Sequence, residues 1–390
     1  MDTAYLATPK PPPSLHIPDS PSTVDVRVID TNTLIYLKPS LFWQPSLPNF
    51  DGIDAPIYCF LISHNDHHII FDLGVRPDWE NSAPKTVSII KAATVVTPGT
   101  DVASTLDSDS SGLNIRSKDI DAVIWSHNHF DHIGNMSTFP PSTDLILGPG
   151  VRAASWPGWP SNPEAEILDS DIHGRAVREI SFDGATTDQV LKIGRFDAVD
   201  FFRDGSFYLL DALGHAVGHL CALARTTAHP PSFVFLGADA CHHAGVLRPT
   251  EYLPLPRSVA PSSPFPRDST ADAKELTGEI LNRGICPGAL HQRLTLAQRP
   301  DAPFFTVANG PLFADHDAAM GTVRKMQEVD AAGDVFVLIA HDGSLRGKIP
   351  LFPERINGWM AHGLRAETRW LFCKDFEGAL GDVETAGSCC

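Results

Sequence analysis

The order of apolar and polar residues predicts a chain in which strands recur with helices between them. Residues 24–30 alternate between apolar and polar side chains, which is typical of a strand with one buried face. Short apolar runs predict further strands, and helices are expected at 85–93, 151–156 and 315–329. The further strands are expected at residues 57–63, 69–73, 120–125, 143–147, 207–213, 220–225, 233–238 and 335–340.

Turn and linker residues mark the connections between these elements. Asn65-Asp66 separates two of the apolar runs and predicts a hairpin. Residues 100–112 are rich in serine and aspartate, so we expect an exposed connection there. The first 23 residues are rich in proline, and such a segment is extended and forms no core of its own.

One segment, residues 126–135, suggests chemistry more strongly than any other. It follows the expected strand 120–125 and holds three histidines and an aspartate within six residues: His127, His129, Asp131 and His132. Each side chain would need a polar partner at the end of a buried strand, and a metal ion supplies one. His127 and His129 project to the same side of an extended backbone and can reach one ion. Asp131 and His132 follow a turn and can face a second ion.

The residue types in this cluster limit the metal. Neutral imidazoles with a carboxylate suit zinc, iron or manganese. The cluster contains no cysteine, which argues against a closed structural zinc site.

Composition narrows the function classes. The chain has 390 residues, enough for one large domain or two, and a formal net charge of −17. Phosphate binding needs clustered lysine and arginine, so 30 basic against 47 acidic residues argues against a nucleic-acid partner. No apolar run approaches the ~20 residues of a membrane span, and residues 1–5 lack the start of a secretory signal, so we expect a cytoplasmic protein.

The seven cysteines include no CxxC pair, which predicts reduced thiols in an intracellular protein. Cys59 and Cys221 lie in apolar runs and are expected in the core. The terminal pair Cys389-Cys390 could suggest lipidation, but the polybasic stretch that accompanies such anchors is missing. A disordered tail is the simpler interpretation.

The segment His127 to His132 resembles the His-x-His-x-Asp-His signature of the metallo-beta-lactamase superfamily. Three downstream segments resemble further motifs of that family in the same order: Gly214-His215 to Gly218-His219, Asp239 after an apolar run, and His341 after another. The resemblance covers about residues 24–345 and implies an α/β fold of the αβ/βα sandwich type. Two mixed β-sheets would then lie face to face, with helices outside.

The resemblance also implies a site with two divalent ions, zinc first and iron or manganese as alternatives. It implies seven metal ligands: His127, His129 and His215 at one ion, Asp131, His132 and His341 at the other, and Asp239 bridging both. A metal-bound hydroxide would attack a carbonyl carbon, and Asp131 would also orient this nucleophile. Asp72 and Gly74 would shape the floor of the site, and His219 would support a ligand without being one.

Within the superfamily, residues 126–134 most resemble the N-acyl homoserine lactonases. Those enzymes carry a tyrosine three residues after the bridging aspartate, where this chain has His242. We expect His242 to donate a proton to the leaving group, with His243 or Tyr252 as alternatives. The expected function is therefore a hydrolase that opens a lactone or related ester of a small molecule.

Other reactions of the same fold are kept as alternatives. Thioesters or cyclic amides of a secondary metabolite or xenobiotic are the first alternative. An enzyme resembling the mononuclear iron persulfide dioxygenases is the second. We expect no nucleic-acid or membrane partner and leave a homodimer open.

The expected domain organisation follows from the ligand positions. Residues 1–23 form an N-terminal extension, 24–375 the hydrolase domain, and 376–390 a tail. Residues 243–300 are rich in proline and lie between two ligands, so they are expected to form a lid or a wall of the substrate pocket.

Overall fold

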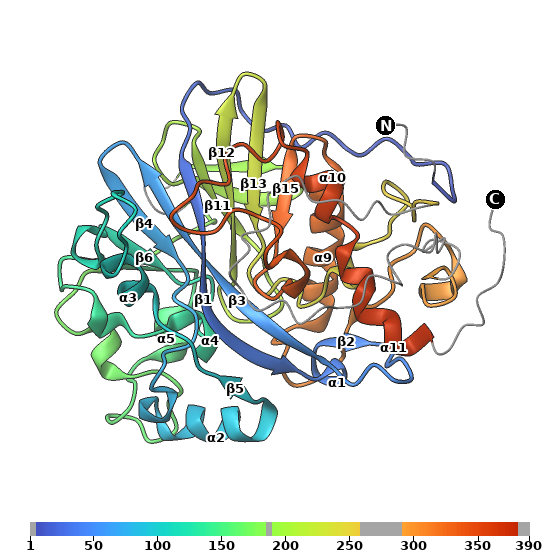
Figure 1. Ribbon diagram of the computed structural model, residues 1–390. Helices are drawn as coiled ribbons and strands as arrows, with labels where there is room; N and C mark the ends of the chain where they lie inside the picture. The colour runs from blue at the N-terminus through green and yellow to red at the C-terminus, as the bar shows by residue number, and fades with distance from the viewer. Residues whose placement is uncertain (1–4, 185–188, 258–290, 381–390) are drawn as a thin grey trace.

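Two β-sheets stack face to face in the computed structural model, which describes residues 5–184, 189–257 and 291–380 (Figure 1). The first sheet has seven strands in the order β5 (Val96–Thr97), β1 (Asp25–Leu37), β3 (Ile53–His64), β4 (His67–Phe71), β6 (Ala122–Ile124), β7 (Asp144–Leu147) and β8 (Val177–Glu179). The second has six, in the order β15 (Val335–Leu338), β13 (Pro231–Leu236), β12 (Leu220–Ala228), β11 (Phe207–Asp211), β10 (Phe196–Asp200) and β9 (Val190–Ile193). A small sheet pairs β2 (Trp43–Gln44) with β14 (Thr306–Val307).

Both large sheets are mixed. Strands β4, β6, β7 and β8 run parallel, whereas β1, β3 and β4 pair antiparallel. In the second sheet, β13 and β15 are parallel and the other pairs are antiparallel. The carboxyl ends of parallel strands meet at one edge of a sheet, which is where side chains of a site can gather.

The uninterrupted apolar runs arise because the strands are buried on both faces. In β3, Tyr58, Phe60 and Ile62 lie in the core between the sheets. Cys59 and Leu61, which alternate with them, face the outer cluster that covers the first sheet. Strand β12 repeats this arrangement, with Leu220 between the sheets and Cys221 outside. Both cysteines are thus buried in the core, as expected.

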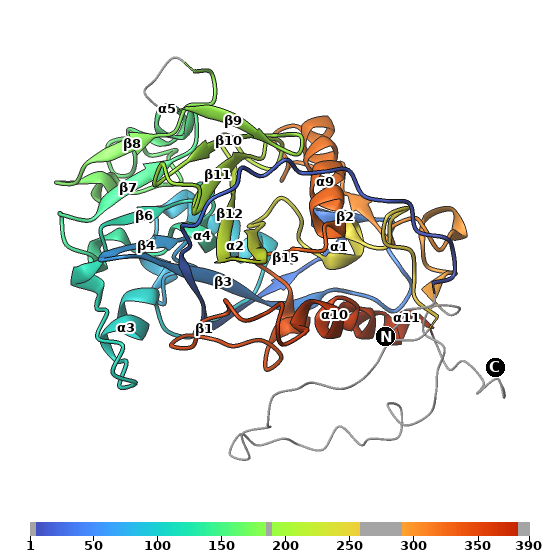
Figure 2. The same cartoon turned by 90° about the horizontal axis from the view of Figure 1, so that it is seen from above.

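Helices cover the outer faces of the two sheets. In the described residues the helices are α1 (Pro39–Phe42), α2 (Pro84–Ala93), α3 (Val102–Asp107), α4 (Phe130–Ile133), α5 (Val151–Ser155), α6 (Ala244–Leu247), α9 (His316–Ala331), α10 (Leu364–Thr368) and α11 (Glu377–Leu380). Short 3-10 turns are η1 (Trp79–Asn81), η2 (Ser117–Asp119), η3 (Met136–Thr138), η4 (Asp169–Ile172), η5 (Leu296–Gln298), η6 (Gly343–Leu345) and η7 (Leu371–Phe376). Figures 1 and 2 show α3 on one side of the stacked sheets and α9 on the other. The expected αβ/βα sandwich is confirmed.

One expected connection is a helix. Residues 100–112 were predicted to be an exposed connection, which is wrong for α3. Asp101 caps this helix by accepting a hydrogen bond from the Ser104 amide at 2.6 Å. Val102, Ala103 and Leu106 pack into the cluster outside the first sheet. The helix is only six residues long, so its apolar face was hidden among serines and aspartates.

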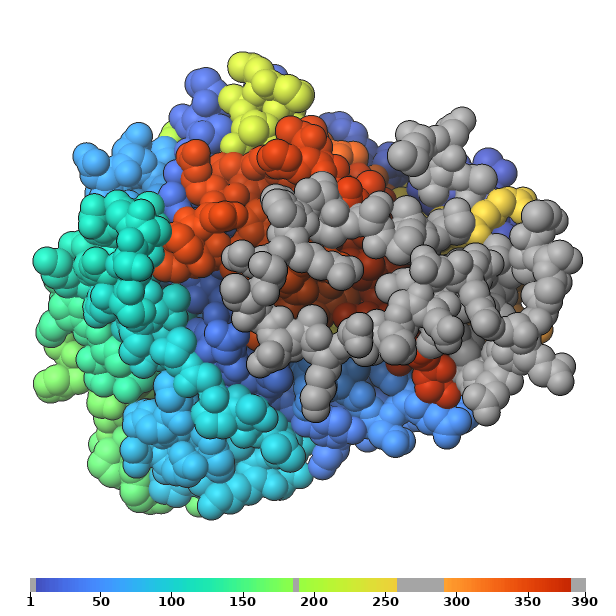
Figure 3. Space-filling model, viewed as in Figure 1, coloured from blue at the N-terminus to red at the C-terminus, as the bar shows by residue number. Residues whose placement is uncertain are grey.

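Segments from both ends of the chain pack along the sandwich. The Leu6 amide donates to the Leu255 carbonyl at 2.8 Å, and the Gly194 amide donates to the Leu15 carbonyl at 2.6 Å. Near the other end, the Phe352 amide donates to the Val28 carbonyl of β1 at 2.7 Å. Figure 3 shows orange-red residues of the C-terminal part of the chain beside blue residues of its N-terminal part.

Only part of the expected lid lies in the described chain. Residues 258–290 and the terminal cysteines fall outside the described residues. The stem that precedes them is buried from residue 241 to residue 250 and includes α6. Within the described ranges, no helix combines the length and the apolar character that a membrane span needs.

Candidate metal centre

Polar side chains follow the ends of strands in both sheets and meet at one place. His127 comes three residues after Ile124, the last residue of β6, and His215 lies in the loop between β11 and β12. Asp239 follows β13, and His341 follows β15. The structure brings all seven expected ligands together in two groups: His127, His129, His215 and Asp239, and Asp131, His132, Asp239 and His341.

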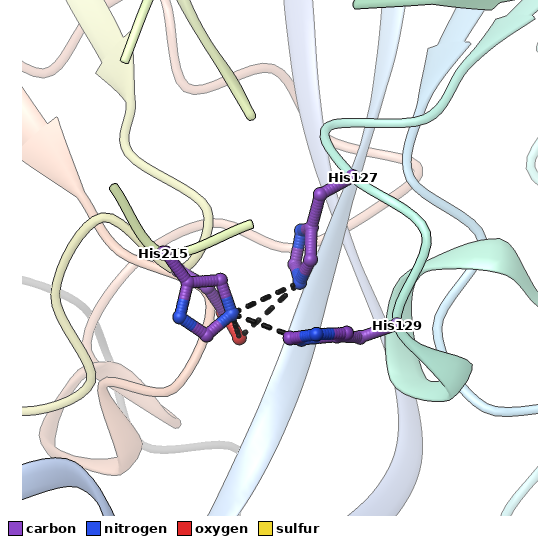
Figure 4. Close-up of side chains that lie close together, drawn as sticks. His127, His129 and His215 are labelled. Carbon is purple, nitrogen blue, oxygen red and sulfur yellow. Dashed lines mark hydrogen bonds and ion pairs between the residues drawn. The ribbon is translucent and has the colours of Figure 1, made fainter. Parts of the chain in front are cut away.

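The first group is built from three imidazole rings. Figure 4 shows His127, His129 and His215 with their nitrogens directed toward one another. His215 Nε2 lies 3.2 Å from His127 Nε2 and 2.9 Å from His129 Nδ1. Asp239 approaches this group through Oδ2, which is 3.5 Å from His215 Nε2 and 3.8 Å from His127 Nε2.

The second group uses the other oxygen of the same aspartate. Asp239 Oδ1 lies 3.0 Å from His132 Nε2 and 2.9 Å from His341 Nε2. Asp131 Oδ2 completes the group at 3.7 Å from His132 Nε2 and 3.6 Å from His341 Nε2. One carboxylate therefore faces both groups, as a bridging ligand would.

The donor atoms fit divalent metal ions. Within each group, the candidate ligand atoms all lie within 4.8 Å of one another. His132 Nε2 and His341 Nε2 are buried within 3.0 Å of the buried Asp239 Oδ1, yet none of the three atoms makes a hydrogen bond of acceptable geometry with a described residue. Such atoms are costly to bury unless something binds them, and a cation bound by imidazole and carboxylate is the partner that this chemistry favours.

Burial and neighbouring charges set the protonation of the histidines. Burial, with the adjacent imidazoles, lowers the pKa of His127 and His215 well below the ordinary value. The rings are thus neutral, which is the form that binds metals. Burial opposes charge on His132 and His341 as well, but the Asp239 carboxylate and its acidic neighbours raise the pKa of both. The carboxylates around this half of the site therefore favour positive charge there, which a bound divalent ion would supply.

Groups outside the two clusters orient the ligand rings. Asp72 Oδ2 lies 2.7 Å from His132 Nδ1, and Asp72 Oδ1 accepts a hydrogen bond from the Ser126 amide at 2.7 Å. His341 Nδ1 lies 2.9 Å from the Pro56 carbonyl and donates to it. In both histidines, the nitrogen opposite to this contact is the one that faces Asp239. Such contacts determine which tautomer presents a lone pair to a metal.

His219 contacts the backbone of the bridging aspartate. Its Nε2 accepts a hydrogen bond from the Asp239 amide at 3.2 Å. Burial lowers the pKa of His219 to about 3, which keeps the ring neutral and able to accept. His219 belongs to neither ligand group, and it holds Asp239 through the backbone amide, away from the carboxylate that faces the ligands.

The loop that carries His215 is held by a close approach between its backbone at Gly214 and the backbone of α9. Gly214 has φ +122°, and a Cβ there would lie 2.0 Å from the Ala319 amide nitrogen of α9. The Ala314 amide donates to the His215 carbonyl at 3.0 Å. The start of α9 therefore fixes the position of His215.

The two adjacent histidines after Asp239 point in different directions. His242 Nε2 lies 3.0 Å from Asp239 Oδ2, and its ring is 4.4 Å from Phe42 and 5.6 Å from His341. His243 instead points into an aromatic cluster, with Nε2 facing Asp375. Tyr252 lies beside Glu251, which it contacts through its hydroxyl. Of the three expected proton donors, the structure brings His242 to the candidate metal centre.

Several contacts at this centre had no signal in the sequence. The Pro56 carbonyl is 285 residues from the His341 ring that it orients. Phe313 packs edge-on against His215 at 5.3 Å and against His242 at 5.8 Å. An isolated proline carbonyl and an isolated phenylalanine carry no pattern, so only the strand order reveals them.

Known proteins resemble this chain over most of its length. A family model described as the metallo-beta-lactamase superfamily matches residues 52–229. The metallo-hydrolase mfmC of Annulohypoxylon moriforme is 65% identical, covering 97% of this chain and 94% of that protein. The gamma-lactamase FDB1 of Fusarium pseudograminearum is 42% identical, covering 94% of this chain and 85% of that protein.

Two further comparisons concern length and fold. Three Penicillium proteins named cytochrome P450 monooxygenases are 49 to 51% identical, but this chain spans only 39 to 40% of their length. Among solved structures, a B. thuringiensis AiiA variant with bound N-decanoyl-L-homoserine has a TM-score of 0.50 at 16% identity. That comparison covers 86% of this chain and 100% of the other, and shows a shared fold.

Proposed function

Since this chain belongs to the metallo-beta-lactamase superfamily and is a metal-dependent hydrolase, we propose that it uses two divalent ions to open a lactone or related ester of a small molecule. The observation that carries this proposal is that the two oxygens of the Asp239 carboxylate face different ligand groups. Its Oδ2 faces His127 and His215, whereas its Oδ1 faces His132 and His341. A single ion would need only one of these two groups.

The seven ligands would hold zinc in both groups. The ligands proposed for one ion are His127, His129 and His215, for the other Asp131, His132 and His341, and for both Asp239. Bound divalent ions supply Lewis-acid chemistry to hydrolysis, because they lower the pKa of water and polarise a carbonyl group.

We assign His242 as the residue that donates to the leaving group. Burial lowers the pKa of His242, so its ring is neutral at neutral pH and carries one proton. The ring nitrogen on the side of the metal centre is Nε2, 3.0 Å from the acidic Asp239 Oδ2, which favours the proton on this atom. Neutral His242 can therefore donate a hydrogen bond from Nε2 to a departing oxygen or nitrogen, and it can transfer a proton to that atom when the ring is in its protonated, imidazolium form.

Asp131 is assigned a second role in addition to metal binding. Its Oδ2 stands 3.6 Å from His341 Nε2, and its side chain is almost fully buried beside His132. A buried carboxylate at this position can accept a hydrogen bond from the attacking water and so orient it.

A cyclic amide is the second candidate substrate. Two relatives named gamma-lactamases, from Fusarium pseudograminearum and Gibberella moniliformis, are 42% and 45% identical to this chain. Nitrogen is a poorer leaving group than oxygen, so a lactam would depend on the His242 proton more strongly than a lactone.

Metal analysis with matched variants tests the proposal. Purified protein should contain about two transition-metal ions per chain, and should hydrolyse at least one member of a panel of lactones, lactams and thioesters. His127→Ala and Asp239→Ala should each lose metal and activity. His67→Ala, at an exposed histidine paired with Asp121, should lose neither.

Three results would contradict the proposal. The first is a wild-type protein without a transition metal. The second is hydrolysis that survives both His127→Ala and Asp239→Ala. The third is a single iron per chain with oxygen consumption, which would favour the dioxygenase alternative.

A further inference from the structure

Two consecutive aromatic residues pack against two consecutive histidines. The Phe42 ring lies 4.4 Å from the His242 ring, and the Trp43 ring lies 5.1 Å from the His243 ring. Both segments are extended here, with φ −146° at Trp43 and φ −147° at His243. Neighbouring side chains of an extended backbone point to opposite sides, so His242 and His243 must diverge.

His243 occupies a closed aromatic cluster. Its side chain is buried, and it has ring contacts with Trp43 and with four phenylalanines: Phe50, Phe305, Phe372 and Phe376. The phenylalanines come from three separate parts of the chain. A ring enclosed in this way has little freedom to change its orientation.

The polar contacts of His243 determine its tautomer. Nδ1 accepts a hydrogen bond from the Gly245 amide at 2.9 Å, so His243 caps the start of α6. The proton of the neutral ring is then on Nε2, which lies 3.4 Å from Asp375 Oδ2. One ring nitrogen thus holds α6, and the other faces the C-terminal segment.

The backbone of His243 is also held. Its carbonyl accepts a hydrogen bond from the Val246 amide at 2.9 Å and one from the Cys241 thiol at 3.0 Å. The ring contacts and these backbone hydrogen bonds together hold the whole residue, so a change that displaces His243 would also displace the peptide that joins it to His242. The position of His242 beside Asp239 therefore depends on the position of His243.

From these contacts we propose that His243, held by the aromatic cluster around Trp43 and by the Gly245 amide, is a positioning residue that sets His242 against the bridging aspartate. The proposal rests on the role assigned above to His242. His243 itself faces away from the metal centre and touches none of the seven ligands in the contacts described. Its effect on the reaction passes through the adjacent residue.

The first test reads the His242 ring directly and needs no activity. In metal-free full-length protein labelled with ¹⁵N-histidine, the His242 signals are assigned from their loss in His242→Phe. His243→Asn retains an oxygen that can cap α6 but removes the ring, and it should shift or broaden the His242 signals. Unchanged His242 signals in a folded His243→Asn protein would overturn the proposal.

A matched control separates positioning from loss of packing. Phe304 lies in the same cluster, 4.6 Å from Phe376 and 5.9 Å from Phe372, and contacts His291 in place of His243. Phe304→Leu should lower the unfolding temperature but leave the His242 signals unchanged. If Phe304→Leu and His243→Asn change these signals equally, the effect is general loosening and the proposal is wrong.

The second test is a double-mutant cycle on the best hydrolysed substrate. A misplacement of about 1 Å can cost about 100-fold in rate, so His243→Asn should lower kcat by about 10- to 100-fold with little change in KM. In a His242→Phe background, the same change should cost less than about twofold, because its target is already gone. Equal losses in both backgrounds would overturn the proposal.

The two tests separate the possible failures. If the protein hydrolyses no substrate, the proposed function fails, and the nuclear magnetic resonance result alone decides whether His243 positions His242. Asp375→Asn, which keeps an oxygen opposite Nε2, should preserve the His242 signals better than Asp375→Leu. The reverse order would argue against a role for Asp375.

Discussion

Asp72 shows how a single residue prepares a metal ligand. It has φ +64°, in the left-handed region where aspartate and asparagine are found more often than other residues with a side chain. Burial raises the pKa of Asp72, while the His132 ring and the Ser126 amide oppose this shift. The residue that orients the His132 ring therefore combines a left-handed backbone with a buried carboxyl group.

Substituting Asp72 should weaken metal binding. Asp72→Asn tolerates the same backbone conformation but removes the charge that holds the His132 ring. Loss of such an orienting partner typically costs 10- to 100-fold, so we expect metal affinity to fall by about that factor. Competition with a chelator of known affinity measures the change.

A second buried aspartate provides the control for this measurement. Asp171 in η4 is 5% exposed, and burial raises its pKa to about 7. It lies outside both ligand groups, so Asp171→Asn should leave metal affinity unchanged. Equal affinities for Asp72→Asn and wild type would show that Asp72 does not orient the ligand.

At the scale of elements, helix α9 joins the candidate metal centre to a buried ion pair. Its first turn is capped by Asp315, which accepts from the Ala318 amide at 2.9 Å, next to the His215 loop. Its last turn carries Asp330, which accepts two hydrogen bonds from Arg248 at 2.7 Å. Burial opposes ionisation of Asp330, but the guanidinium overcomes it and lowers its pKa to about 2.

Breaking this ion pair should destabilise the protein. Asp330→Ala leaves the Arg248 charge buried without its partner, and such losses cost about 3–5 kcal/mol in the free energy of unfolding. Asp317→Ala, at an exposed position of the same helix, should cost less than about 0.5 kcal/mol. Urea unfolding at pH 7 measures both, and similar values for the two variants would contradict this account.

The contribution of Asp330 should also depend on pH in a defined direction. Its pKa is lower in the folded protein, about 2, than the ordinary 3.8 of an unfolded chain. The stabilisation is therefore complete above the unfolded value and is lost as pH falls through the folded one. The difference in the free energy of unfolding between wild type and Asp330→Ala should be constant from neutral pH to about pH 5. It should shrink in more acidic solution.

At the scale of the whole molecule, the candidate ligands come from both sheets. His127, His129, Asp131 and His132 follow β6 of the first sheet, whereas His215, Asp239 and His341 follow strands of the second. Ions bound by these residues would connect the two halves of the sandwich. Metal binding and global stability should therefore be linked.

Metal removal should lower the unfolding temperature. Ions that bind only the folded chain stabilise it by about 2.7 kcal/mol at a free concentration of 100 times Kd. Calorimetry with and without a chelator should show a lower unfolding temperature for the wild type when the chelator is present. Asp239→Ala, which lacks the bridging carboxylate, should respond little, and an equally large response there would point to metal bound elsewhere.

Much of the fold and of the candidate site was visible in the sequence, because it depends on neighbours along the chain. Strands buried on both faces require uninterrupted apolar runs, so β3, β6, β13 and β15 could be predicted. The polar residues that end these runs, such as His127, Asp239 and His341, stood out against them. Helix α3 could not be predicted in this way, because six residues that include a serine and a threonine show only a weak helical periodicity of apolar side chains.

The tertiary structure alone decided which distant groups meet. Asp72 reaches His132 across 60 residues, and the Pro56 carbonyl reaches His341 across 285, because of strand order and register. The sequence placed two histidines side by side after Asp239 and could not tell them apart. Packing against Phe42 turns His242 toward the candidate ligands, and packing against Trp43 turns His243 into the core. Local pattern determines which segments become strands, whereas side-chain direction at a site depends on contacts that only the folded chain brings together.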